Sequence, residues 1–559
     1  MATSSAPSRA HTPIASHTTP IADIILHNGP IWRGFEEGTT QALALWQGRV
    51  LATGTLDELS PYKGDHTRII DLEGRLATPG FTDAHLHPTY LGVVMDWVDI
   101  TPQKAPTLEA LLSAVKARVE QSAPGDWVFA SGYDQTKLDV KRHPTLAELD
   151  AIAPNNPVML IRTCTHVQIA NSLAMKAGGI DDSTPDPDGG QIGKENGKLT
   201  GFLAENASAP VFDAVPPLSR DAAIDAIERA GNYCLSVGIT SVMDAAIGMK
   251  AGFEEIAAYN EAKRTGRLPV RTWMALRATP AHDNIVPQCE AVGLVSGVGD
   301  DMLMVGSVKL FLDGSIGGAT AWMTEGYLAD KDNHGLQMIP TQELEAMVLE
   351  YHEKGYQICA HAIGDGAIEQ LITAYEKALT AYPDPDRRHR VEHSGFLAPD
   401  HNERMQKAGI IPSPQQVFLY DFGDAYITMI GKERVYSSYP QKTWTDMGLK
   451  PPAGSDSPVC DPAPWTNLYA MLTRKTGAGT QLDPSECLSI EEALQSYTEY
   501  GAYSQKQEHV RGKLMPGYLA DVAVFSRNLL EATPEEILND TLCDLTILNG
   551  KVFYERKEG

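Results

Sequence analysis

Residues 81–88, Phe-Thr-Asp-Ala-His-Leu-His-Pro, decide how the rest of this chain is interpreted. In an extended strand, side chains two residues apart point to the same face, so His85 and His87 project together, with Asp83 one step behind. Two neighbouring imidazoles at a strand end, closed by Pro88, are natural ligands for a borderline metal such as zinc. Alone, this His-x-His pattern is a weak signal, because surface or packed histidines produce it as well.

Further residues of metal-binding type follow at the ends of later β-rich runs. His361 stands in HAIGDGAI, His393 in RVEHSGF and Asp456 in GSDSPV. Histidine has only an intermediate preference for burial, and aspartate is rarely buried without a partner. Packing therefore does not explain this set of histidines and a carboxylate, and the sequence predicts a metal site.

The middle of the chain alternates β-rich runs with amphipathic stretches. In residues 341–355 and 364–382 the apolar positions recur at intervals of three and four, which is typical of a helix. The polar residues above stand at the carboxyl ends of the expected strands, where a (β/α)8 barrel carries its active site. We therefore expect an α/β fold, a TIM-like metal-dependent hydrolase barrel, rather than an open doubly wound sheet. The expected strands are 80–87, 238–245, 304–314, 356–362, 388–393, 410–416 and 449–456.

Short strands and Gly-containing turns mark both ends of the chain. Residues 22–79 plus 508–559 are therefore expected to form a composite β-sandwich domain. The catalytic barrel would span 80–507, with a Pro- and Gly-rich insertion at about 101–217 that caps its mouth. Residues 1–21 are rich in Ser, Thr, Ala and Pro and lack the apolar core of a secretory signal, so we expect a disordered tail.

Composition narrows the classes of partner. The formal net charge of -26 argues against nucleic acid, whose phosphates need Lys and Arg, and against an anionic membrane surface. No apolar run approaches the roughly 20 residues that span a bilayer. The seven cysteines are scattered, odd in number and without CxxC spacing, so neither a disulfide framework nor a thiolate metal site is expected. These features predict a cytoplasmic enzyme with a small-molecule substrate.

Several longer motifs, in this order, resemble the amidohydrolase superfamily, specifically its YtcJ-like branch (amidohydrolase 3), which includes N-substituted formamide deformylase. The resemblance covers nearly the whole chain after the N-terminal tail. It rests on TPGFTDAHLHP, ASGYDQTKL, PTLAELD, VKLFLDGSIGGATA, HAIGDGAI, RVEHSGF, GSDSPV and GKLMPGYLADVAVF. Dimers are common among such enzymes, so a homodimer is one expected assembly.

The resemblance implies a ligand set for two divalent ions: His85, His87, Lys309, His361, His393 and Asp456. The more buried ion would be bound by His85, His87 and Asp456. His361 and His393 would bind the second ion, and Lys309, as a carboxylated lysine, would bridge the two. A structural Lys309 paired with Asp313 or another carboxylate is the alternative, and it would favour a single metal. Nitrogen and oxygen ligands suit zinc, while manganese, iron and cobalt stay open.

Metal chemistry then implies the reaction. A bound metal lowers the pKa of its water from about 15.7 to about 7 and so supplies hydroxide at neutral pH. Asp456 would act as the general base for this water and would pass the proton to the departing nitrogen. The expected activity is hydrolysis of a C–N bond in an amide-like small molecule, such as an N-acyl or N-formyl amine.

Five residues are expected near the substrate: Tyr133, Asp134, His166, Asp313 and Trp322. An ordinary loop role is equally open for His166, and plain packing is the default for an aromatic such as Trp322. Arg390 and Glu392 flank His393 and are expected on the opposite face of the strand, with a structural role.

Other functions stay open. A deaminase of a heterocyclic amine would use the same barrel, but such enzymes usually carry Glu three residues after the fifth-strand histidine, where this chain has Gly364. Carbamates or cyclic amides are alternative substrates. A non-catalytic scaffold would typically lack ligand histidines, and here all are present. Cys164 and Thr165 before His166, and Gln416 after Gln415, depart from the family pattern near the expected pocket, so familiar substrates need not transfer.

Overall fold

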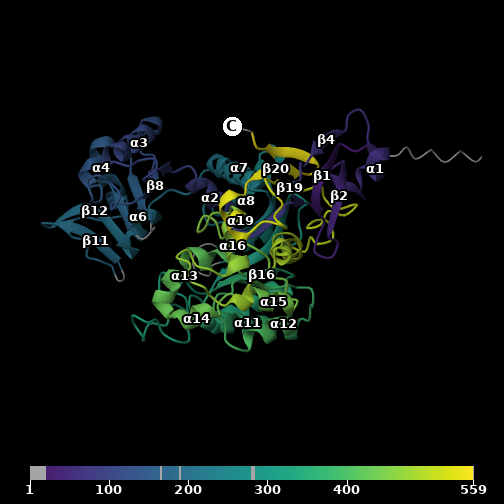
Figure 1. Cartoon of the computed structure of the whole chain (residues 1–559). Helices are drawn as coiled ribbons and strands as arrows, with labels where there is room; N and C mark the ends of the chain where they lie inside the picture. Colours follow the sequence, from purple (N-terminus) through teal and green to yellow (C-terminus); the bar gives the residue numbers. More distant parts are fainter. Residues whose placement is uncertain (1–19, 164–166, 188–189, 279–283, 558–559) are drawn as a thin grey trace, which may run out of the picture. The chain divides into compact units, whose positions relative to one another are not determined.

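The computed structural model describes residues 20–163, 167–187, 190–278 and 284–557 (Figure 1). The chain divides into two compact units. Unit 1 comprises Met1–His87, Gly231–Ala246 and Pro269–Gly559, and unit 2 comprises Pro88–Ala230 and Ile247–Leu268. The expected tail falls almost wholly outside the described residues, and the domain boundaries expected from the sequence stay predictions.

A nearly closed parallel sheet of seven strands forms the wall of a TIM-like barrel in unit 1. Along the sheet the strands are β6 (Phe81–Leu86), β13 (Ile239–Ile247), β14 (Arg271–Arg277), β15 (Leu303–Phe311), β16 (Gln357–Ala362), β17 (Arg390–His393) and β18 (Ile411–Ser413). β6, β13 and β17 are buried along their whole length, as expected for parallel strands covered on both faces. Every strand expected before residue 420 is present, whereas β14 was not expected from the sequence, since Thr272 is its only β-branched residue.

Residues 453–457 lie beside β6 at the open edge of this sheet. Three backbone hydrogen bonds join the two: Ala84 N to Ala453 O (2.8 Å), Asp456 N to His85 O (2.7 Å) and His87 N to Ser457 O (2.8 Å). The expected strand 449–456 is therefore not a regular strand, but its end takes the place of an eighth strand. This pairing puts Asp456 next to His85 of β6 and to His87, which directly follows the strand.

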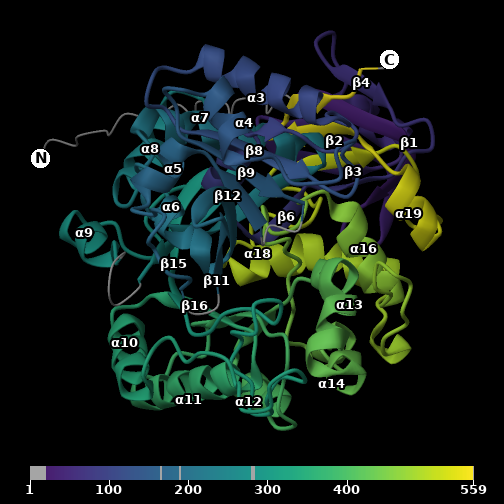
Figure 2. The ribbon, with the colours of Figure 1, turned by 90° about the vertical axis from the view of Figure 1, so that its left-hand side faces the viewer.

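Helices follow the barrel strands of unit 1 and the segment at its open edge. In chain order they are α9 (Val286–Ala291), α10 (Thr341–Glu353), α11 (Asp365–Ala381), α12 (His401–Ala408), α13 (Val417–Ile430), α14 (Lys432–Tyr436), α15 (Gln441–Asp446), α16 (Pro464–Thr473), α17 (Ile490–Gln495), the π-helical turn η4 (Ser496–Tyr500) and α18 (Gly501–Ser504). α10, α11 and α12 lie side by side (Figure 2). Ser489 begins α17 with a capping box to Glu492, which satisfies backbone N–H groups that have no partner within the helix.

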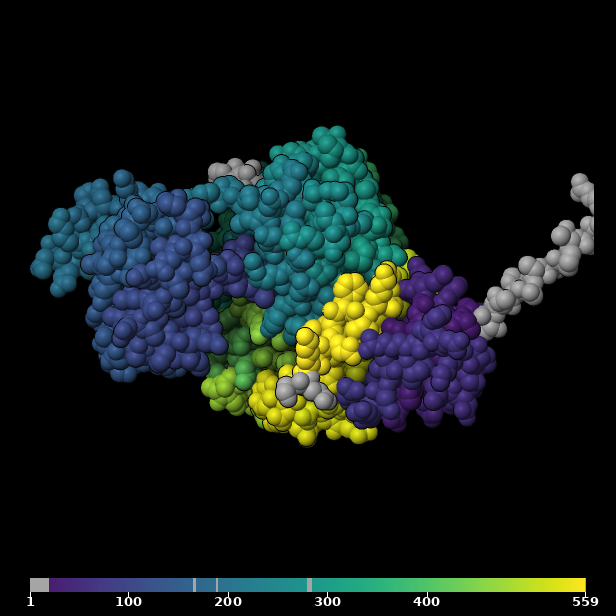
Figure 3. All heavy atoms as spheres, turned by 90° about the horizontal axis from the view of Figure 1, so that it is seen from above, coloured from purple at the N-terminus to yellow at the C-terminus, as the bar shows by residue number. Residues whose placement is uncertain are grey.

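Both ends of the chain contribute to a second sheet of eight strands in unit 1. The N-terminal strands are β1 (Ile24–Trp32), β2 (Thr39–Trp46), β3 (Arg49–Gly54), β4 (Arg68–Asp71) and β5 (Ala77–Pro79), and the C-terminal ones are β19 (Val522–Phe525), β20 (Cys543–Leu548) and β21 (Lys551–Glu555). β5 and β19 pair antiparallel and join the two groups, and Figure 3 shows the yellow C-terminal atoms against the purple N-terminal ones. The helix α1 (Leu56–Leu59) lies between the N-terminal strands of this sheet, and α19 (Pro534–Asp540) lies between its C-terminal strands. The sandwich arrangement of this domain stays a prediction.

Unit 2 has its own sheet of six strands, with the order β11-β12-β10-β9-β8-β7. They are β7 (Val98–Asp99), β8 (Val128–Tyr133), β9 (Val158–Arg162), β10 (Val167–Ala170), β11 (Gly190–Glu195) and β12 (Lys198–Glu205). Its helices are α2 (Pro88–Val94), α3 (Leu108–Gln121), α4 (Leu146–Ile152), α5 (Ser172–Ala177), α6 (Ala209–Asp213) and α8 (Glu254–Arg264), while α7 (Arg220–Ser236) runs from unit 2 into unit 1. Within the described ranges of the whole chain, no helix combines the length and the apolar character that crossing a membrane requires.

A buried ion pair ties the barrel to the terminal sheet within unit 1. Arg271 at the start of β14 donates to both carboxylate oxygens of Asp521, over 2.6 and 2.9 Å. Asn549 N also donates to Asp521, over 2.8 Å. Both charged side chains are at least 93% buried and have little contact with water. Each charge is therefore stabilised by the opposite charge of its partner.

We expect Asp521→Asn to destabilise the protein by about 3–5 kcal/mol, because it leaves the Arg271 guanidinium buried without a counter-charge. The midpoint of urea unfolding measures this change. Glu254→Gln is the matched control, since it removes a carboxylate from the exposed pair with Arg220 and should cost at most about 1 kcal/mol. Equal shifts in the two variants would contradict the assignment.

Candidate metal centre

The expected metal-binding residues of separate strand ends come together at one end of the barrel sheet. Ligand atoms of His85, His393 and Asp456 all lie within 4.8 Å of one another. His87 Nε2 is 3.2 Å from Asp456 Oδ1, and the His361 ring centroid is 4.4 Å from that of His393. The site lies at the carboxyl ends of the strands, the end at which TIM-like barrels carry their chemistry.

Three nitrogen atoms of this cluster are buried and have no hydrogen-bond partner in the part of the chain that the structure describes. Among the described residues, His85 Nε2, His87 Nδ1 and Lys309 Nζ have none. Leaving a buried polar atom unpaired costs about 1–3 kcal/mol, so three such atoms in one cluster indicate a missing ligand. Nitrogen donors next to the Asp456 carboxylate are the donor set that zinc and related ions prefer, and the residues therefore fit a divalent metal.

Lys309 has surroundings that favour its uncharged form. Its side chain is fully buried, and its Nζ lies 4.8 Å from the centre of the Phe311 ring. Burial lowers the pKa of this amine below its ordinary value. A neutral amine is the form that can react with carbon dioxide, so the environment is compatible with carboxylation.

Hydrogen bonds to the ring nitrogens define which nitrogen of each histidine can bind a metal. Glu392 Oε2 accepts from His85 Nδ1 over 2.5 Å, so the lone pair of His85 is on Nε2. His393 Nδ1 faces Gln415 Oε1 at 2.6 Å, and this again leaves Nε2. His361 differs, because its Nε2 donates to the Gly314 carbonyl over 2.8 Å and leaves Nδ1 as the free nitrogen.

Glu392 contacts His85 of the cluster, although the sequence predicted it on the face of the strand turned away from His393. In the β16–β17 register Glu392 pairs with His361, so the two side chains share a face of the sheet. His393 reaches the same site only because its backbone is left-handed, with φ 71°. Strict alternation along RVEH therefore misled the prediction. The signal available was Arg390 two residues earlier, a potential buried partner for a carboxylate on the same face.

Arg390 holds the Glu392 carboxylate in place. Its Nε and Nη2 donate to the two carboxylate oxygens over 2.7 and 3.0 Å, and both side chains are fully buried. Burial alone would raise the pKa of Glu392, but Arg390 and His85 hold it well below its ordinary value. Asp456 behaves likewise: burial acts to raise its pKa, and the contacts with His85 and His87 keep it well below the usual range. Both carboxyl groups are therefore ionised.

Two of the site residues have strained backbones. His393 and Asp456 have φ 71° and 57°, in the left-handed region that side chains other than Gly seldom adopt. Such conformations cost about 1–3 kcal/mol each and are concentrated at functional sites. Here the left-handed backbones occur at two residues whose side chains lie within 4.8 Å of one another and of His85.

Asp313, one of the expected substrate residues, has its oxygens occupied by backbone donors. Ile363 N donates to Oδ1 over 3.0 Å, and Trp322 N and Gly364 N donate to Oδ2 over 2.9 and 2.8 Å. The carboxylate thus joins the loop after β15 to the loop before α11. Burial raises the pKa of Asp313 to about 7. Its Oδ1 also lies 3.4 Å from His361 Nε2, so Asp313 contributes to the position of a site histidine.

Gly364 is required by the same loop contact. A Cβ at this position would lie 2.0 Å from the Trp322 carbonyl oxygen, far inside van der Waals contact. Any side chain, including the Glu of zinc deaminases, would push the Trp322 segment away. The Trp322 side chain itself is partly exposed, and its contact with a substrate stays a prediction.

The other expected substrate residues belong to unit 2. The Tyr133 hydroxyl contacts His143 Nδ1 at 3.0 Å, and Asp134 accepts from Thr136 N and from Arg162 over 3.0 and 3.3 Å. These contacts give both residues structural partners within their own unit. His166 lies outside the described residues.

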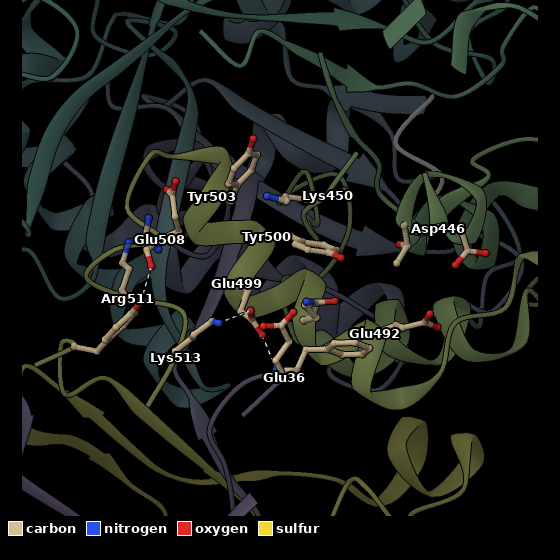
Figure 4. A pocket seen from close by; sticks show the side chains of 14 residues that line it. Glu36, Asp446, Lys450, Glu492, Glu499, Tyr500, Tyr503, Glu508, Arg511 and Lys513 are labelled. Atoms are coloured by element: carbon tan, nitrogen blue, oxygen red, sulfur yellow. Dashed lines mark hydrogen bonds and ion pairs between the residues drawn. The ribbon is translucent and has the colours of Figure 1, made fainter. Parts of the chain in front are cut away.

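Apart from the candidate metal centre, unit 1 has a concavity of about 570 Å³. Its lining is rich in charged and tyrosine side chains (Figure 4). Within the lining, Lys513 pairs with Glu499 at 3.3 Å, and Glu508 pairs with Arg388, a residue outside the lining, at 2.7 Å. Lys450 precedes the segment 453–457, so this concavity lies by the amino ends of the barrel strands. It therefore lies at the end of the barrel opposite the metal centre.

Comparison with known proteins agrees with this geometry. The sequence model of the Amidohydrolase family matches residues 68–554. The chain is 31% identical to YtcJ of Bacillus subtilis (strain 168), over 95% of this chain and 99% of that protein. It is 26% identical to N-substituted formamide deformylase of Arthrobacter pascens, over 92% and 95% of the two chains. The crystal structure of an uncharacterized metal-dependent hydrolase from Pyrococcus horikoshii OT3 superposes with a TM-score of 0.75, at 26% identity, over 92% of this chain and 99% of that one.

We expect Asp313→Asn to lower the thermal stability of the metal-free protein by about 1–3 kcal/mol. In either orientation of the side-chain amide introduced at position 313, its NH2 group lies opposite a backbone N–H. That N–H donates to the Asp313 carboxylate in the wild type and would lose its acceptor. Differential scanning calorimetry measures the change. Asp365→Asn is the control, because Asp365 accepts from Thr324 at an exposed position and should matter less. An unchanged melting temperature for Asp313→Asn would show that the carboxylate is not needed to hold the loops.

Proposed function

The chain belongs to the amidohydrolase family and is a metal-dependent hydrolase of C–N bonds, and we propose that its substrate is an N-acyl or N-formyl amine or a related amide. The observation that carries the proposal is the cluster of buried, partnerless nitrogen atoms around the ionised Asp456. The name of one relative, N-substituted formamide deformylase, makes formamides the first class to test. A homodimer and a cytoplasmic location stay predictions.

In this proposal the six expected ligands hold two divalent ions, zinc first and manganese, iron or cobalt as alternatives. Nε2 of His85, together with His87 and Asp456, would bind one ion. Nδ1 of His361 and Nε2 of His393 would bind the other. Lys309, whose pKa is lowered by burial, would once carboxylated supply an anionic group to both. The hydrogen bonds to the outer ring nitrogens support this set, because they orient three of the imidazoles before any ion binds.

When bound, such ions polarise a carbonyl group and lower the pKa of water to about 7. The Asp456 carboxylate would take a proton from the attacking water as its oxygen bonds to the carbonyl carbon. The same carboxyl group would then give this proton to the nitrogen as the C–N bond breaks. General base and acid catalysis of this kind contributes about 10²–10⁴-fold. Asp456 suits this role because its carboxylate is ionised and only 8% exposed. Little bulk water therefore reaches it to compete for the proton.

The alternative functions differ in their products. Hydrolysis of an amide, formamide or carbamate releases an amine or opens a ring, whereas a deaminase releases ammonia from a heterocycle. The close approach of the Trp322 carbonyl to Gly364 argues against deamination, since it excludes the acidic side chain that such enzymes carry there. We therefore rank amide hydrolysis first.

The experiment that tests the proposal combines metal analysis with a substrate panel. Protein purified without chelators is analysed by elemental mass spectrometry, then assayed with N-substituted formamides, acetamides, carbamates, cyclic amides and heterocyclic amines. Two metal equivalents with release of an amine support it. Ammonia release from heterocycles would favour the deaminase, and no metal uptake on adding zinc or manganese would overturn the proposal.

We expect Asp456→Asn to keep the fold but to lower kcat by about 10²–10⁴-fold or more, because the amide cannot accept the proton of water. Circular dichroism and metal content of the variant show whether the site is otherwise preserved. Asp461→Asn is the matched control, since Asp461 bonds the Tyr233 hydroxyl at an exposed position nearby. Substantial turnover by Asp456→Asn would exclude this residue as the base.

A further inference from the structure

We propose that the concavity by the amino ends of the barrel strands is a second ligand site, and that it binds the ammonium group of a small organic amine. It belongs wholly to unit 1, and the inference does not depend on the reaction proposed above. Its volume of about 570 Å³ is in the range of small-molecule sites. Three features of the lining point to such a ligand: an unpartnered amide, a π-helical turn and an excess of carboxylates.

The side chain of Gln495 is buried in the lining without a partner. The residue is only 8% exposed, and within the described part of the chain its side-chain amide has no hydrogen-bond partner. Native structures rarely leave a buried amide unpaired, because the loss of its bonds to water is costly. An amide oxygen accepts hydrogen bonds, so an ammonium group in the concavity would supply the missing partner.

Gln495 directly precedes η4, the π-helical turn between α17 and α18. Turns of this kind are rare and occur frequently at functional sites. One part of this turn has a structural use, because the Ser496 carbonyl accepts from Ala453 N over 3.1 Å. That bond does not account for Tyr500, whose side chain lines the concavity and whose hydroxyl has no hydrogen-bond partner among the described residues.

Carboxylates outnumber basic groups in the lining, five to three. Asp446 and Glu492 share one partner outside the lining, Lys442, so their charges are only partly compensated. Burial and the nearby carboxylates, Glu499 among them, raise the pKa of Tyr500 to about 12. Figure 4 shows the Tyr500 hydroxyl turned toward the side on which Asp446 and Glu492 lie. A positive group is therefore favoured next to this hydroxyl.

The basic side chains of the lining are already engaged within the protein. Lys513 lies between two carboxylates, Glu37 at 2.8 Å and Glu499 at 3.3 Å. Arg511 donates to Thr82 Oγ1 over 2.9 Å. These contacts leave the Gln495 amide and the Tyr500 hydroxyl as open groups, and both can accept a hydrogen bond from an ammonium group.

Aromatic rings in the lining favour an organic cation over a metal ion. Lys450 Nζ and the Arg388 guanidinium carbon lie 3.9 and 3.8 Å from the centre of the Tyr503 ring, so this ring already holds cations. The rings of Tyr500 and Phe35 also belong to the lining, and in the described ranges neither has a cation of the protein against its face. Ring faces attract ammonium groups, and the apolar part of an amine can pack on the same rings.

Ligand-observed NMR titration of the full-length protein tests the inference, with phenethylammonium as the probe. Phenethyl alcohol and phenylacetate are its neutral and anionic counterparts, and we expect only the ammonium to bind. Gln495→Leu should weaken its binding by about 10–100-fold, because a hydrogen bond to a charged group is lost. Tyr500→Leu should weaken it by about 3–30-fold, because the ring is lost.

Tyr436→Leu is the matched control, because Tyr436 is an exposed tyrosine on α14 outside the lining, and it should leave binding unchanged. Melting curves show whether each variant folds. If the two cavity variants do not fold, Asp446→Asn decides, since Asp446 is exposed, and we expect it to weaken binding by about 2–5-fold.

Unchanged binding in the folded cavity variants would mean that the amine binds elsewhere, for example at the metal centre, and would overturn the inference. Equal binding of the alcohol or of phenylacetate, or no binding of the ammonium, would also overturn it. All of these outcomes leave the proposed function standing, since metal content and the substrate panel decide that question separately.

Discussion

The pairing of β6 with residues 453–457 is the contact on which the rest of the site depends. Hydrogen bonds such as that from Asp456 N to His85 O fill the open edge of the barrel sheet and fix the carboxylate beside His85 and His87. Residues almost four hundred positions apart in the chain are thereby held at one strand end. Without this pairing the sheet would keep an exposed edge, and the histidines would have no carboxylate next to them.

Burial then gives the assembled residues their chemical character. The same low-polarity surroundings that lower the pKa of Lys309 make unpaired nitrogen atoms costly, and they strengthen the electrostatic attraction between Arg390, Glu392 and His85. The left-handed backbones of His393 and Asp456 are tolerated because the surrounding strands and loops hold them. Stability is thus given up locally in order to hold donor atoms ready for an ion.

The groups behind the histidines orient the imidazole rings before any ion binds. A carboxylate oxygen of Glu392 accepts from His85 Nδ1, and the side-chain amide oxygen of Gln415 faces His393 Nδ1. His85 and His393 come from β6 and from the end of β17, which are not neighbours in the sheet, so the curvature of the barrel is what brings the two rings together.

The sequence by itself determined the barrel strands from β6 to β18 except β14, the contribution of both chain ends to small β-strands, and the identity of the residues that meet in the centre. Periodicity and residue type carry this information, because they reflect burial and chemistry position by position. Only the tertiary structure decided that Glu392 faces the site and that Asp313 serves its loops. The first depends on the register of β17 with β16, and the second on how the loops after β15 and β16 meet. The alternation of residues along a single strand specifies neither of them.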